Sequence, residues 1–101
     1  MSQVTMMQAR DLFKDRRPFT ASSCYARRLA HGYAVFSYGE HFPLFVYSNV
    51  SQSWFMNCDR YSATTARHRS HFKRVLVERG DGIHEESTNG VMLALDRLSE
   101  Q

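Results

Sequence analysis

The side chains with the most evident chemical use lie in one short run in the second half of the chain. Thr64 and Thr65 carry hydroxyls, Arg67 carries a fixed positive charge, and His68 carries an imidazole that titrates near neutral pH. If this run opens a helix, its hydroxyls and unpaired backbone N–H groups can hold a phosphate or a carboxylate, and Tyr61 is close enough in sequence to join them. The alternative is structural: a hydroxyl caps the helix, and His68 fills the core with a ring nitrogen bonded to a backbone carbonyl.

Catalysis is not the activity that the sequence indicates. Nucleophilic catalysis needs a nucleophile, a base and a group that orients the base. The sequence has no nucleophile elbow, no catalytic-cysteine signature and no glycine-rich phosphate loop. Residues 84–86, His-Glu-Glu, lack the second histidine of the zinc-peptidase pattern, and we expect them in an exposed loop. We therefore predict a protein that is not an enzyme and needs no cofactor, with a hydrolase built on Tyr61, Thr65 and His68 as the catalytic alternative.

Cysteine and histidine side chains offer the ligand types that zinc accepts, at Cys58, His68 and His71, with Cys24 distant in sequence. Their spacing matches no known zinc module, so we predict no metal site and two buried thiols. Two cysteines are too few for a disulfide framework, which favours a reducing compartment such as the cytoplasm.

Positive charge is concentrated between residues 60 and 79. This segment has six basic residues and one acidic residue, a net charge of +5, whereas residues 80–101 carry a net charge of −4. Such a local charge attracts phosphate, and rings such as those of Tyr33, Tyr47 or Phe55 can stack on unpaired bases. The alternative is a solvated helix face that the acidic C-terminal segment partly neutralises. The residues that we expect to bind nucleic acid or a partner are Arg60, Thr64, Thr65, Arg67, Arg69, Lys73 and Arg74.

The elements that position these residues are predicted from capping and hydrophobic patterns. The length of 101 residues corresponds to one domain, which we expect to span residues 1–101. A first helix is predicted from Ser2 to Asp15, because Thr5 and Gln8 form the pattern of a capping box. Residues 24–29 fit either a strand or a short helix, and we prefer the strand.

The centre of the chain is rich in aromatic and β-branched residues, which favour strands. Short connections between its apolar runs predict an antiparallel meander. A helix then runs to Arg79 with Ser62 or Thr64 as its N-cap, and a last helix runs from about Asn89 to Ser99. We predict an α+β fold in which a small antiparallel β-meander of three to four strands packs against this central basic helix, with flanking N- and C-terminal helices. The strands are predicted at residues 33–38, 44–47 and 53–57.

Two stretches resemble a pattern found in small uncharacterised proteins of phages and other mobile elements. The first is Trp54-Phe55-Met56-Asn57, of the form Trp-x-x-Asn, and the second is the run from Tyr61 to His68, of the form Tyr-Ser-x-Thr-Thr-x-x-His. The resemblance covers about residues 33–76, somewhat less than half of the chain. It implies a small accessory protein of phage or plasmid origin in the host cytoplasm, and it implies no settled activity.

Two functional hypotheses follow. The first is an accessory protein that binds nucleic acid through segment 60–79; the second is an inhibitor of a host defence complex, of the anti-CRISPR kind, that acts by protein–protein contact. The expected partner is thus nucleic acid or a host nucleoprotein complex. Nine of the 13 aromatic residues lie between residues 33 and 61, more than one helix-covered sheet face can easily hide. The aromatic residues on the second face are expected either to form a homodimer interface or to lie under the N- and C-terminal helices. No apolar run approaches the ~20 residues of a membrane helix, so we expect no membrane partner.

Overall fold

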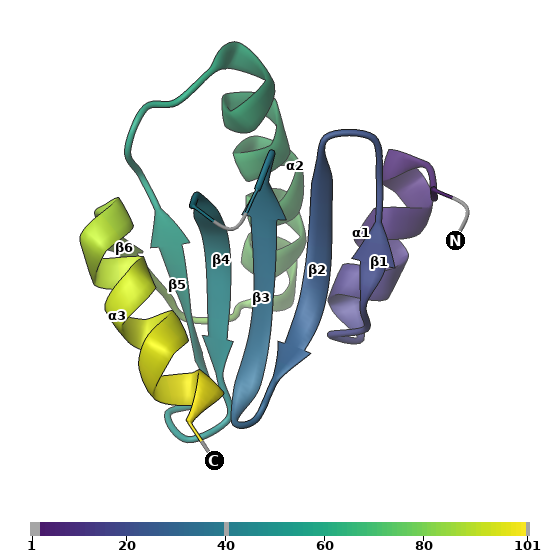
Figure 1. Ribbon diagram of the computed structural model, residues 1–101. Helices are drawn as coiled ribbons and strands as arrows, with labels where there is room; N and C mark the ends of the chain where they lie inside the picture. Colours follow the sequence, from purple (N-terminus) through teal and green to yellow (C-terminus); the bar gives the residue numbers. More distant parts are fainter. Residues whose placement is uncertain (1–2, 40, 101) are drawn as a thin grey trace.

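The fold is α+β, with three helices and six strands in the part of the chain that the structure describes (Figure 1). The structure, a computed structural model, describes residues 3–39 and 41–100. Ser2, the predicted start of the first helix, lies outside these residues. The described residues 3–5 are not helical, so the predicted start is too early, and the helix begins at Met6 after its N-cap Thr5. In chain order the elements are α1 Met6–Lys14, β1 Phe19–Thr20, β2 Cys24–Leu29, β3 Gly32–Ser37, β4 Pro43–Ser48, β5 Ser53–Asn57, α2 Ala63–Arg79, β6 Ile83–Glu86 and α3 Thr88–Ser99.

The strands form one mixed sheet in which spatial order follows sequence order, from β1 to β6. Strands β1 to β5 are antiparallel neighbours, and β6 pairs with β5 in parallel, with Ile83 opposite Trp54. The parallel pairing is possible because α2 returns the chain to the starting end of β5, the crossover that parallel strands require. The strand preferred for residues 24–29 is confirmed as β2.

The predicted number of strands, three to four, is wrong, because the described residues form two further strands, β1 and β6. Strand β1 has only two residues, too few to show a periodic pattern. Residues 84–86, expected in a loop, belong to β6 instead. Their side chains are exposed as expected, but the backbone pairs with β5, and this pairing depends on where the crossover delivers the chain rather than on local composition.

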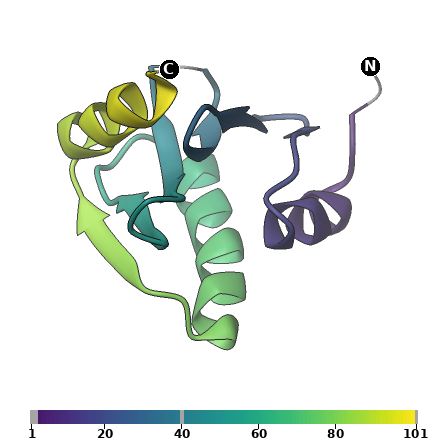
Figure 2. The same cartoon turned by 90° about the horizontal axis from the view of Figure 1, so that it is seen from below.

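Helices cover both faces of the sheet (Figures 1 and 2). Helices α1 and α2 lie on one face, and α3 lies on the other, over β4 and β5. The smaller core, beneath α3, contains six buried residues: Ala34, Phe36, Val46, Val91, Leu95 and Leu98. The aromatic residues of the central strands are thereby divided between two cores.

The larger core is a cluster of aromatic rings between α1, α2 and the sheet. The ring of Phe13 from α1 lies 4.8 Å from that of Trp54 and 4.7 Å from that of Phe72, measured between centroids. Phe45 and Tyr33 add further tilted or edge-on contacts. All five side chains are almost completely buried. Such rings contribute large apolar areas and prefer these tilted geometries, so the cluster fixes how the two helices sit on the sheet.

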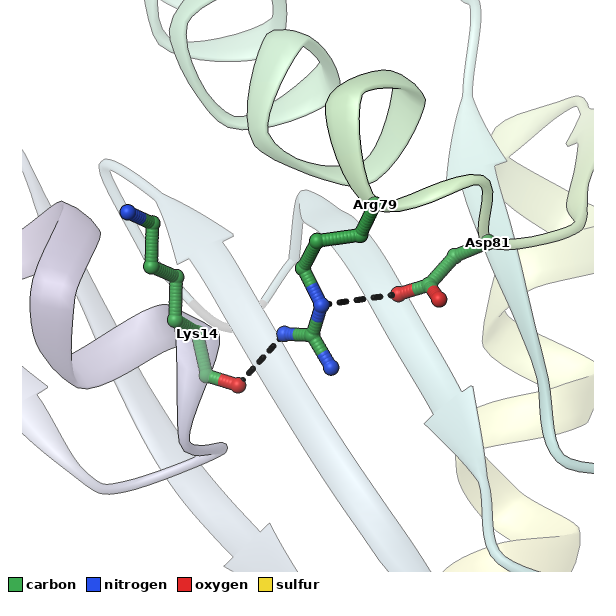
Figure 3. A network of polar contacts seen from close by, with 3 residues as sticks. All are labelled: Lys14, Arg79 and Asp81. Atoms are coloured by element: carbon green, nitrogen blue, oxygen red, sulfur yellow. Dashed lines mark hydrogen bonds and ion pairs between the residues drawn. The ribbon is translucent and has the colours of Figure 1, made fainter.

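Polar contacts at both ends of α1 hold it against α2. The predicted capping box is confirmed, with the Thr5 side chain accepting from the N–H of Gln8. A ring nitrogen of His71 lies 3.2 Å from the carbonyl oxygen of Met6. At the other end, the Arg79 guanidinium lies between two acceptors (Figure 3). It donates to the carbonyl oxygen of Lys14 over 2.6 Å, and its Nε lies 3.7 Å from Oδ2 of Asp81.

No helix within the described residues is both long and apolar enough to cross a membrane.

Candidate functional site

Helix α2 begins at a serine cap, in agreement with one of the two predicted caps. Ser62 has an extended backbone, and its hydroxyl accepts from the N–H of Thr65 over 3.1 Å. Thr64 is therefore inside the helix rather than at its cap. The cap satisfies one of the backbone donors that a helix start leaves without a partner.

Thr65 and His68 lie on the buried side of α2 and bond to strand β3. The hydroxyls of Thr65 and Ser37 are 2.8 Å apart, and Nδ1 of His68 lies 3.3 Å from the same serine oxygen. Ser37 and Thr65 are completely buried, and His68 is 7 % exposed. These contacts agree with the structural interpretation of Thr65 and His68 rather than with an anion-binding site. The one difference is that His68 bonds to a serine hydroxyl instead of the expected backbone carbonyl. No substrate can reach the hydroxyls of Ser37 and Thr65 without opening the core.

Arg69, expected in the binding set, binds the protein's own backbone. Its Nε donates to the carbonyl oxygen of Asn57 over 2.8 Å, and its Nη2 donates to that of Asp59 over 2.7 Å. The segment between β5 and α2 is fastened at the same place by Asn57, whose amide donates to Pro43 and Thr88. Arg69 therefore positions this segment, and the Asn of the phage-like pattern has a structural role beside it.

Four basic side chains of segment 60–79 do point to solvent. They form what we call the basic face: Arg60, Arg67, Lys73 and Arg74. Within residues 3–39 and 41–100, none of the four takes part in an ion pair. Arg67 and Arg74 are seven residues apart and lie on one outward stripe of α2, which Ser70 shares. This stripe carries the positive charge that the sequence predicts.

The exposed aromatic surface differs from the predicted one. Tyr33 is buried, Phe55 stacks on His84, and Tyr47 lies beneath the guanidinium of Arg16, 4.3 Å from its ring centroid. Two other tyrosines, Tyr38 and Tyr61, are each 49 % exposed. We call them the tyrosine pair. The predicted strand at residues 33–38 includes Tyr38, but β3 ends at Ser37, so Tyr38 lies where the chain leaves the sheet.

Ring contacts and one hydrogen bond hold the tyrosine pair at the start of α2. The two ring centroids are 5.8 Å apart, and the Tyr61 ring packs on buried Phe42 at 4.8 Å. The Tyr61 hydroxyl lies 3.1 Å from Nε2 of His41. In Figure 1 the loop after β3 and the first turn of α2 lie at the same end of the sheet. A surface pocket of about 420 Å³ adjoins Tyr61 there, and its lining residues are Arg60, Tyr61, Ser62, Ala63, Ala66 and Arg69.

The two cysteines differ from each other. Cys24 is buried, as predicted, and burial raises the pKa of its thiol to about 11. Cys58 is exposed, so its predicted burial is wrong, and its Sγ donates to Glu85 over 3.4 Å. Partial desolvation and the Glu85 carboxylate raise the pKa of Cys58, which disfavours a reactive thiolate. Among the described residues no three His, Cys, Asp or Glu side chains are placed to hold a metal ion together.

Comparison with protein-family models, with curated proteins and with solved structures finds no match for this chain.

Protonation of His68 is expected to destabilise the fold. Burial lowers the pKa of His68 below its ordinary value of 6.5, and the charges of Arg67 and His71 act in the same direction. Below pH 6.5 the unfolded chain therefore binds this proton more readily than the folded chain. The contribution of His68 to the free energy of unfolding is therefore fully present above pH 6.5. It is lost as the pH falls from 6.5 to the folded-state pKa, by at most about 1.4 kcal/mol per pH unit. Urea unfolding of wild type and of His68→Asn at several pH values across this range measures the loss.

The control for this experiment is His84→Asn, because His84 is exposed. This variant should keep the wild-type pH dependence, whereas His68→Asn should flatten it. If wild type and His68→Asn showed the same pH dependence, the destabilisation at low pH would not come from protonation of His68.

Removal of the Arg69 side chain should destabilise the protein more than removal of its helix neighbour. Arg69→Ala leaves two backbone carbonyls without their charged donor, so we expect a loss of about 1–3 kcal/mol in the free energy of unfolding. Arg67→Ala, on the exposed stripe, should change it by no more than about 0.5 kcal/mol. Chemical denaturation followed by fluorescence of buried Trp54 compares the two. The structural role of Arg69 is wrong if both variants unfold at the same denaturant concentration.

Proposed function

We propose that this protein acts by binding nucleic acid, with the basic face of α2 contacting the phosphate backbone. The observation that carries the proposal is the outward stripe of Arg67 and Arg74, which have no carboxylate partner among the described residues. Arginines without a carboxylate partner can neutralise phosphates, and on a helix they do so without any ordering of the backbone. Arg60, which precedes α2, and Lys73, which is the neighbour of Arg74 in the helix, are also exposed and extend the positive surface.

The sequence pattern supports a biological setting for this binding. The resemblance of Trp54–Asn57 and Tyr61–His68 to small phage and mobile-element proteins favours an accessory protein of such an element, working in the cytoplasm of the host. Most residues of the pattern have structural roles here: Trp54 lies in the core, Ser62 caps α2, and Thr65 and His68 bond to β3. The pattern therefore supports a shared fold and setting, while the charge supports the binding.

Charge reversal on the outward stripe tests the proposal. The double variant Arg67→Glu, Arg74→Glu should weaken binding of labelled DNA or RNA at least tenfold at about 50 mM salt. The plot of log affinity against log salt concentration should become shallower by about two in slope, because two phosphate contacts are lost. Fluorescence anisotropy titrations measure both quantities. The control is Arg28→Glu with Arg97→Glu, which changes the net charge equally but on β2 and α3. The proposal fails if the two double variants bind alike.

One observation favours the alternative function, an inhibitor that acts by protein–protein contact. A groove of about 490 Å³ lies between α3 and the turn that joins β4 to β5, with Phe55, Ala94 and Leu98 in its lining. Leu93 is 65 % exposed and Val50 is 81 % exposed at this groove. Exposed apolar side chains around a groove are typical of protein contact sites, whether the partner is a host protein or a second copy of the chain.

A single substitution in the groove tests the alternative. If the protein inhibits a host complex through α3, Leu93→Asp should abolish stoichiometric binding of that complex, and the Arg67→Glu, Arg74→Glu variant should keep it. If the groove forms a homodimer, light scattering should show a dimer for wild type and a monomer for Leu93→Asp. Wild-type behaviour of Leu93→Asp in both experiments would exclude this groove as the contact site.

A further inference from the structure

We propose that the nucleic acid is single-stranded, and that the tyrosine pair stacks on an unpaired base next to the basic face. This inference rests on the proposed function and names the form of its ligand. Bases in a duplex are already stacked on one another, whereas a single strand offers exposed base faces to aromatic side chains. Three observations at the tyrosine pair support the single strand.

The first observation is that the exposed rings are fixed before any ligand arrives. Tyr61 packs on Phe42 and its hydroxyl pairs with His41, so one side of the ring is supported and about half of the side chain remains exposed. Tyr38 packs against Tyr61 from the loop after β3. A ring that is already held loses little conformational freedom when a base stacks on it, which favours binding.

The second observation is the backbone of Tyr38. Its φ angle is 70°, in the left-handed region that bulky residues rarely adopt. The conformation is held by hydrogen bonds on both sides, from the N–H of Tyr38 to Ser23 and from the N–H of Ser37 to Phe42. Glycine would occupy this position without strain. Arg16 and Gln52 also have positive φ angles, and among these three residues Tyr38 alone is aromatic. A strained backbone conformation that presents an exposed ring supports a function for that ring.

The third observation is the pocket beside Tyr61. Its volume of about 420 Å³ falls in the range of small-ligand sites, and Ala63 and Ala66 leave room in it. Arg60 also lines the pocket and is exposed, so an anionic group beside a stacked base meets positive charge there. Arg69 lines the pocket as well, but its guanidinium already donates to two backbone carbonyls. From here the outward stripe of α2 continues with Arg67 and Arg74. A duplex would meet the same arginines through its phosphates but would leave the tyrosine pair unused.

Substitutions that remove a ring without removing charge test the inference. The probes are a fluorescein-labelled oligothymidylate of about 12 nucleotides and a labelled duplex of the same length. We expect wild type to bind the single strand at least tenfold more tightly than the duplex at equal salt. Tyr38→Gly and Tyr61→Leu should each weaken single-strand binding about fivefold or more and leave duplex binding unchanged. Tyr61→Phe, which keeps the ring, should bind the single strand like wild type.

Folding of the variants is controlled within the same set. Because glycine accepts the φ angle of Tyr38, the relief of strain should offset the lost ring contact with Tyr61, so we expect Tyr38→Gly to melt near the wild-type temperature. Melting curves of each variant show that it is folded at the temperature of the binding experiment. Equal affinity for single strand and duplex, or wild-type binding by Tyr38→Gly and Tyr61→Leu, overturns the inference and leaves the proposed function standing. Absence of salt-sensitive binding to both probes overturns the proposed function itself.

Discussion

The packing of aromatic rings between α1, α2 and the sheet is the interaction on which the rest of the structure depends. Phe13, Trp54 and Phe72 come from three different elements and meet in one buried cluster. Burial of rings of this size contributes a large share of the apolar area that drives folding. The cluster also sets the rotation of α2, because Phe72 must face the sheet. Once that rotation is set, Arg67 and Arg74 on the opposite side are directed to solvent.

The two ends of α2 are held by polar contacts that the ring cluster does not supply. At its start, Thr65 and His68 bond to Ser37 of β3, and Arg69 fastens the incoming segment through two backbone carbonyls. At its end, Arg79 bridges to α1 and to the turn after the helix. These contacts connect the start of α2 to the loop that carries Tyr38. The tyrosine pair therefore lies at the start of α2, and the basic face runs from there along the helix to Arg74.

The residues of segment 60–79 divide into structural and surface groups according to the side of the helix that they occupy. Thr65 and His68 lie on the buried side, and Arg67 and Arg74 lie on the outward side. Arg69 lies at the border, where a long side chain can reach either water or a neighbouring loop, and here it reaches the loop. Counting charge along the sequence treats these arginines alike. Their different environments show that only part of the local +5 charge is available to a ligand.

The sequence by itself determined the features that depend on local geometry. The cap at Thr5, the three helices and the central strands follow from short-range patterns, because capping hydroxyls and helical periodicity act within a few residues. For the second helix these patterns leave Ser62 and Thr64 as alternative caps. Only the tertiary structure decided the parallel pairing of β6, the inward bonds of Arg69, the exposure of Cys58 and the position of the tyrosine pair. Each of these depends on contacts between segments far apart in the chain, and no local pattern specifies which segments the folded sheet brings together.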